Sequence, residues 1–190
     1  MKKTTLFATL LFITAVSVSA GNQNTSIGTH GIYLTVQDFL HHHLSYANGE
    51  KIVLNQFTDG PNIKVIEKGE KKIIPKKEVF GYHDNSDKDY RFYHNELFEI
   101  VTAEPWFIYK HYASATAEGK KGFIKKEFYY FSIKGTDELI PLTVENLKKA
   151  FPENLKFHDL LDQVRNDDDL TRYDSYRKEL MIGYLYTKSL

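Results

Sequence analysis

The stretch WFIYKHYASATAEGKKGFIKKEFYYFSI, residues 106–133, decides the fold. Its two ends, Trp106–Tyr112 and Lys125–Ile133, are rich in the aromatic and β-branched residues that favour strands. Between them, Ala113–Gly122 is small, charged and glycine-containing, which is typical of a loop. Strands joined without a helix-length insert are antiparallel neighbours. The stretch therefore predicts a β-hairpin near the centre of the chain.

Strand-like runs continue upstream of this hairpin, at residues 51–57, 63–67, 71–74, 78–83, 90–94 and 97–102. Turn signals separate several of them, such as Asp59-Gly60-Pro61-Asn62 and Lys68-Gly69-Glu70. Because the connections are short, we predict an antiparallel β-meander of about seven or eight strands. Either a strongly curled sheet or a partly open barrel would accommodate it.

Downstream of the hairpin the hydrophobic period changes from that of a strand to that of a helix. An apolar stripe with helical spacing is formed by Phe157, Leu160, Leu161 and Val164. We predict about three C-terminal helices, which begin at Thr143, about Asn154 and about Asp168. The last presents one broad face that carries Leu170, Tyr173, Tyr176, Leu180 and Tyr184. Strands followed by a run of helices indicate an α+β fold.

A short N-terminal helix is also predicted, from Thr35 to about His43. The Thr35 side chain can cap it by accepting from the amide of Asp38, and Leu34 and Phe39 occupy the two positions of a hydrophobic staple. Thr143 repeats this capping pattern at the first of the C-terminal helices.

The first twenty residues have the three-part pattern of a secretory signal peptide. Their uncharged core, Leu6–Val16, is about half the length of a membrane span, which disfavours an uncleaved anchor. We expect cleavage after Ala20, a flexible lead-in over residues 21–30 and a single α+β domain over residues 31–190. Since Gly21 is not cysteine, the protein is not a lipoprotein. We therefore expect a protein exported to the periplasm or the exterior of a bacterium, with no transmembrane segment after cleavage.

The composition excludes several classes of function. Without the leader, the chain keeps 23 Lys and Arg against 25 Asp and Glu, a net charge of about −2. A near-neutral chain lacks the basic footprint of a nucleic-acid binder. The chain has no cysteine, which excludes disulfides, thiol catalysis and thiolate metal sites. Its 13 tyrosines and 13 phenylalanines suit both half-buried sheet faces and binding surfaces.

Two polar clusters resemble metal sites without meeting their geometry. His41-His42-His43 would point about 100° apart on a helix, so the three side chains cannot converge on one metal. The segment 82–89 alternates acidic and amide residues like a calcium loop, but Tyr90 stands where that loop needs glycine. We interpret this segment as an Asp-rich hairpin turn and predict no metal site and no cofactor.

The remaining candidate residues lie on the central strands. His83, Asp84, Arg91 and His94 could meet across a hairpin as an acid–base group, but no serine elbow or pair of glutamates accompanies them. Alternation places Phe128 and Tyr130 on one face of their strand and Tyr129 and Phe131 on the other. We predict no catalytic residue. The candidate binding residues are Tyr82, His83, Asp84, Arg91, Tyr93, His94, Tyr129 and Phe131.

Some segments resemble an uncharacterised group of small secreted bacterial proteins. The resemblance rests on Gly31-Ile32-Tyr33-Leu34-Thr35 with Asp38-Phe39, on Phe80-Gly81-Tyr82-His83-Asp84, and on Tyr90-Arg91-Phe92-Tyr93. It covers about half of the mature chain and implies a location in the cell envelope, with no activity to carry over.

Three functions are consistent with these observations. The first is a non-enzymatic module that binds another cell-envelope protein through an aromatic sheet face or the C-terminal helix. The second is a carrier of a small apolar ligand inside the sheet. The third is a hydrolase or metal-dependent enzyme centred on the hairpin between His83 and His94.

Overall fold

The fold is α+β and is built on one seven-stranded antiparallel sheet, as the sequence predicts. The computed structural model describes residues 30–47, 51–55, 60–116 and 123–190. The predicted signal peptide and residues 21–29 of the lead-in lie outside this part. In spatial order the strands are β1 (Gly31–Tyr33), β5 (Gly81–His83), β6 (Asp89–Tyr93), β7 (Glu96–Thr102), β8 (Phe107–Thr116), β9 (Phe123–Ser132) and β10 (Ile140–Pro141). Within the described residues β1 and β10 do not pair with each other, so the sheet is not closed into a barrel.

Three of the predicted strands leave the meander and form a sheet of their own. These are β2 (Lys51–Val53), β3 (Asn62–Glu67) and β4 (Glu70–Pro75). The expectation that they continue the main meander was wrong, because β4 ends at Pro75 and the 3₁₀ turn η2 (Lys76–Glu78) redirects the chain. Proline fixes its own backbone and donates no ladder hydrogen bond, which favours such a break. The next strand, β5, pairs with β1 and β6.

The helices are α1 (Val36–Leu40), α2 (Val144–Ala150), α3 (Leu155–Leu161) and α4 (Met181–Ser189). The predicted caps are present: Thr35 Oγ1 accepts from the Asp38 amide at 3.0 Å, and Thr143 Oγ1 accepts from the Asn146 amide at 3.1 Å. Within the described residues, no helix has the length and hydropathy that crossing a bilayer requires.

The last predicted helix begins thirteen residues later than expected, at Met181 rather than at about Asp168. The intervening segment folds as η3 (Asp167–Thr171) and a short hairpin of β11 (Tyr173–Asp174) and β12 (Glu179–Leu180). Asp174 Oδ1 accepts from the amides of Tyr176 and Arg177 at 2.9 and 3.0 Å. This local turn competes with helix formation and closes the hairpin instead.

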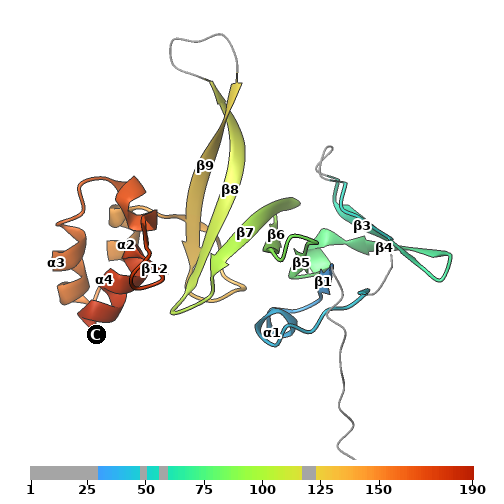
Figure 1. The fold of residues 1–190 in the computed structure, drawn as a ribbon, viewed down its shortest axis with the longest axis horizontal. Helices are drawn as coiled ribbons and strands as arrows, with labels where there is room; N and C mark the ends of the chain where they lie inside the picture. Colours follow the sequence, from blue (N-terminus) through green and yellow to red (C-terminus); the bar gives the residue numbers. More distant parts are fainter. Residues whose placement is uncertain (1–29, 48–50, 56–59, 117–122) are drawn as a thin grey trace, which may run out of the picture.

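Both faces of the seven-stranded sheet are covered. On one face, Phe39 of α1 packs among the rings of Tyr33, Phe80 and Phe107. The other face is covered at one end by α2, α3 and α4 and at the other end by the three-stranded sheet (Figure 1). The hydrophobic cluster beneath the three helices contains Trp106, Phe131 and Phe157. The cluster beneath the three-stranded sheet contains Ile32, Ile63 and Phe92.

Candidate functional site

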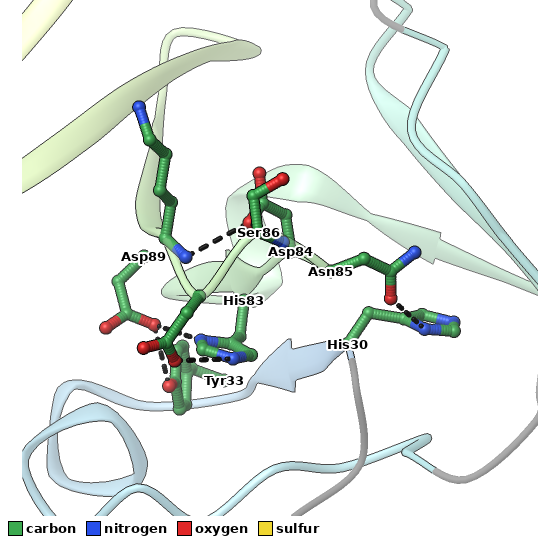
Figure 2. Close-up of polar contacts among 9 residues, drawn as sticks. His30, Tyr33, His83, Asp84, Asn85, Ser86 and Asp89 are labelled. Atoms are coloured by element: carbon green, nitrogen blue, oxygen red, sulfur yellow. Dashed lines mark hydrogen bonds and ion pairs between the residues drawn. The ribbon is translucent and has the colours of Figure 1, made fainter.

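The β5–β6 turn carries a hydrogen-bonded cluster around Asp89. His83 lies opposite Asp89 in the ladder, and its Nδ1 is 2.8 Å from Asp89 Oδ1. The Tyr33 hydroxyl donates to the same oxygen at 2.8 Å from the neighbouring strand β1 (Figure 2). Burial first, and then the Asp89 carboxylate, raise the pKa of Tyr33 well above its ordinary value. The phenol is therefore a protonated donor that connects β1 to β6.

Asp84 builds the turn itself. Its Oδ1 accepts from the amides of Ser86 and Lys88 at 2.8 and 3.0 Å, and its Oδ2 accepts from the Tyr90 hydroxyl at 3.1 Å. Asp87 adopts the left-handed conformation with φ 59°. The interpretation of this segment as an Asp-rich hairpin turn is confirmed. Among the described residues, no group of three or more His, Cys, Asp or Glu side chains could hold a metal ion.

Arg91 is a buried connection between β6 and the segment before β10. Its Nη1 donates to the Tyr109 hydroxyl at 3.2 Å, and its Nη2 donates to the Asp137 carbonyl at 2.7 Å. The guanidinium also lies over the rings of Tyr93 and Tyr109, 5.3 and 5.5 Å from their centroids. Opposite Arg91, a Cβ on Gly81 would lie 2.0 Å from a backbone oxygen, so the close approach requires glycine.

The structure does not bring His94 to His83. His94 follows the far end of β6, where it stacks on the Tyr93 ring with the centroids 4.1 Å apart. Asp89 is the first residue of β6 and His94 lies beyond its last residue, so at about 3.3 Å per residue the length of β6, about 13 Å, separates them. The four residues of the predicted acid–base group therefore occupy four separate settings: the Asp89 cluster, the β5–β6 turn, the Arg91 connection and the β6–β7 turn.

The Asp89 cluster has the proton-transfer groups of an acid–base pair but no reacting partner in contact. His83 Nε2 is 3.7 Å from the carboxylate of Asp87, whose side chain is 98% exposed. In the described part of the chain, no hydroxyl group is hydrogen-bonded to His83. A nucleophile beside the base is what nucleophilic catalysis requires. The hydrogen bonds of the cluster join β1 and β5 to β6 beside the turn.

The remaining predicted residues lie at the sheet faces. Tyr82 is half-buried against the three-stranded sheet, and Tyr93 donates from its hydroxyl to Glu138. Phe131 is fully buried against Trp106, with ring centroids 5.4 Å apart. Tyr129 is half-buried and donates to Glu127 at 3.0 Å, and burial raises its pKa to about 12. Of this group, only the half-buried tyrosines border solvent.

The feature that sequence reasoning missed is the length of the β8–β9 hairpin. Ala113–Thr116 belong to β8, although they were expected in the loop 113–122, and β9 begins at Phe123, before its expected start at Lys125; residues 117–122 lie outside the described part. β8 pairs with β7 only at Ile108, Tyr109 and Lys110, and β9 pairs with β10 only at Tyr130 and Phe131. Beyond these contacts the two strands pair with each other alone and project from the molecule (Figure 1). We call residues 111–116 and 123–128 the arm.

The arm carries aromatic rings beside cations. Lys125 Nζ lies 3.9 Å from the ring centroid of Tyr112, whose residue is 37% exposed, and Lys126 Nζ lies 5.4 Å from that of Phe128. At the base of the arm, His111 stacks on Phe98 with centroids 4.5 Å apart, and its Nε2 is 3.0 Å from Glu96. The contacts of His111 fix the base of the arm. Farther along the arm, the rings of Tyr112 and Phe128 lie beside the positive charges of Lys125 and Lys126. The sequence showed the aromatic run but not where the sheet would end.

Comparison of the chain with known proteins returns no matching family model, no matching curated protein and no matching solved structure. The resemblance to small secreted bacterial proteins stays a prediction.

Proposed function

We propose that this protein is a non-enzymatic binding protein that docks another protein of the bacterial cell envelope through its arm. One observation carries the proposal: within the described residues, neither strand of the arm has an outer sheet neighbour. Unpaired strand edges offer a row of backbone donors and acceptors, to which an extended segment of a partner can add as a further strand.

The side chains of the arm indicate the chemistry of the partner. Tyr112, Lys125 and Lys126 combine a large amphipathic ring with two cations. Lysines on an exposed edge disfavour pairing with a second copy of the same edge, because like charges repel. They favour a partner segment that carries acidic residues. The expected partner is therefore a different protein with an extended, acidic segment.

The other two candidate functions have less support. Enzymatic use of the His83–His94 hairpin requires two histidines that lie apart, since His83 is opposite the first residue of β6 and His94 follows its last. A carrier requires space inside the sheet, whereas packed clusters of aromatic side chains cover its two faces. The location in the envelope or outside the cell is supported by the leader pattern of residues 1–20.

The test is chemical crosslinking in the producing cells, followed by identification of the linked protein and measurement of its affinity with purified components. We expect Lys125→Glu with Lys126→Glu to weaken binding at least about tenfold, because the variant repels an acidic segment. The matched control is Lys156→Glu with Lys188→Glu, which changes the net charge equally on exposed residues of α3 and α4. Equal affinity of both double variants would refute docking through the arm.

A further inference from the structure

A cavity of about 350 Å³ lies where the start of α1, the segment 77–80 and the turn before β10 meet. This volume is within the roughly 300–1,000 Å³ of sites that take small molecules. Its apolar lining residues are Leu34, Val36, Val79 and Phe80. Because Leu34 is 39% exposed, part of this apolar wall is open to solvent. The cavity therefore suits a small ligand with an apolar body.

A buried cation belongs to the wall of this cavity. Arg91 is 6% exposed, and its guanidinium donates to two uncharged acceptors, the Tyr109 hydroxyl and the Asp137 carbonyl. Burial raises the pKa of Tyr109, so this phenol does not become a counter-ion at neutral pH. A buried charge without an opposite charge beside it is costly.

The carboxylates on the neighbouring segment have other partners. The Asp137 carboxylate accepts from the Lys134 amide at 2.9 Å, and the Glu138 carboxylate accepts from the Tyr93 hydroxyl. Among the residues that the structure describes, no Asp or Glu forms an ion pair with Arg91. An anionic ligand would supply the missing negative charge.

One nitrogen of Arg91 is available to such a ligand. Nη1 and Nη2 each donate to one acceptor, whereas Nε has no hydrogen-bond partner. Within the described part of the chain, the indole nitrogen of Trp106 is the one side-chain nitrogen or oxygen that is both buried and without a partner. Arg91 Nε is therefore reached by solvent. Since the rest of this side chain is buried and the residue lines the cavity, we place the Nε–H at the cavity wall.

The charges around the cavity favour a ligand with a single negative charge. Lys77 and Glu78 are exposed lining residues, and neither has an ion-pair partner among the described residues. Their charges offset each other, which leaves the one positive charge of Arg91. A carboxylate matches that charge and accepts well from a guanidinium. A phosphate monoester carries about −1.5 to −2 charges, and its excess charge would be repelled by Glu78.

We propose that this cavity binds a small monocarboxylate with an apolar body. The carboxylate accepts from Arg91 Nε, and the apolar body packs against Leu34, Val36 and Phe80. No residue of the arm lines the cavity, so the proposal does not depend on the function proposed for the arm.

The test is a calorimetric titration of the full mature protein with octanoate, for which we expect saturable binding. Two analogues serve as controls: 1-octanol keeps the chain without the charge, and acetate keeps the charge without the chain. Each should bind at least about tenfold more weakly, because one loses the charged hydrogen bond and the other the apolar contact. No saturable binding of octanoate, equal affinity for either analogue, or tighter binding of inorganic phosphate would overturn the proposal.

Two variants locate the site. Arg91→Gln removes the guanidinium, and we expect octanoate to bind at least about tenfold more weakly. Lys77→Glu adds negative charge to the wall and should weaken binding at least about threefold. Its matched control is Lys71→Glu, an equal change at an exposed residue of β4 that does not line the cavity.

If Arg91→Gln does not fold, the two lysine variants decide the question. Wild-type affinity for octanoate in folded Arg91→Gln, or equal affinity of the Lys77→Glu and Lys71→Glu variants, contradicts the proposed site.

Discussion

The two ends of the β8–β9 hairpin have the same backbone pairing but opposite surroundings. At its root, Ile108 and Phe131 face each other across the ladder and are buried beneath the C-terminal helices. In the arm, Tyr112 faces Glu127 in the same ladder, beyond the reach of β7 and β10. One continuous hairpin is therefore packed into the core at one end and, in the proposed function, offers a binding edge at the other.

The largest expected effect is at the root. Phe131→Ala removes a fully buried ring that contacts Trp106, and we expect it to lower the free energy of unfolding by about 3–5 kcal/mol. Chemical denaturation monitored by circular dichroism measures this loss. A loss below about 1 kcal/mol would mean that the root does not anchor the fold.

A smaller effect is expected in the cluster around Asp89, at the end of the seven-stranded sheet far from α2, α3 and α4. Asp89→Asn weakens the acceptor shared by Tyr33 and His83, and should cost about 1–3 kcal/mol. Asp87→Asn is the matched control, because that side chain is 98% exposed and should change stability by less than about 0.5 kcal/mol. Equal losses in the two variants would show that the cluster does not hold β1 to β6.

Alkaline pH should also weaken the root and its neighbouring strands. Burial raises the pKa of Tyr109 in the folded state, and it raises that of Tyr129 to about 12. Because the unfolded tyrosines release their protons near pH 10, the folded state binds more protons above that pH. Stability should therefore be complete below about pH 10 and fall as the pH rises towards 12. Denaturation midpoints across this range measure the fall, and a flat profile would contradict it.

The smallest expected effect on stability is in the arm. Tyr112→Ala removes a ring that contacts Lys125 at the surface, and we expect a loss of less than about 1 kcal/mol. The same variant should nevertheless weaken partner binding, because tyrosines often dominate interface energies. Paired measurements of denaturation and affinity would separate the two effects. Large destabilisation without a change in affinity would reverse the roles assigned to root and arm.

The α+β class, the antiparallel sheet and the helix caps could be predicted from sequence, but the division of the strands between two sheets could not. Thr35 and Thr143 cap their helices because the acceptor and the amide lie three residues apart. The alternation of Tyr130 and Phe131 between two covered faces follows from strand geometry. The split of the meander at Pro75 depends on which strand β5 joins, and no local pattern specifies that choice.

The candidate site was less predictable than the fold for the same reason. Sequence proximity grouped His83 with His94, yet strand geometry separates them and places His83 beside Asp89, which also accepts from Tyr33. The hydrogen bonds of Arg91 reach Tyr109 and Asp137, which are 18 and 46 positions away in the sequence. The length of the arm depends on where β7 stops pairing with β8 and where β10 stops pairing with β9. The residues of β7 and β10 do not by themselves indicate these end points.

The central claim is that the arm is where a partner binds, and site-specific photocrosslinking tests it most directly. A photoreactive phenylalanine analogue would replace Tyr112 in the arm or, as a control, Tyr176, which is 90% exposed in the turn between β11 and β12. Irradiation of the producing cells should give one discrete crosslinked protein from position 112 and none from position 176. A discrete product from position 176 alone would contradict the account and place the binding surface at the C-terminal end.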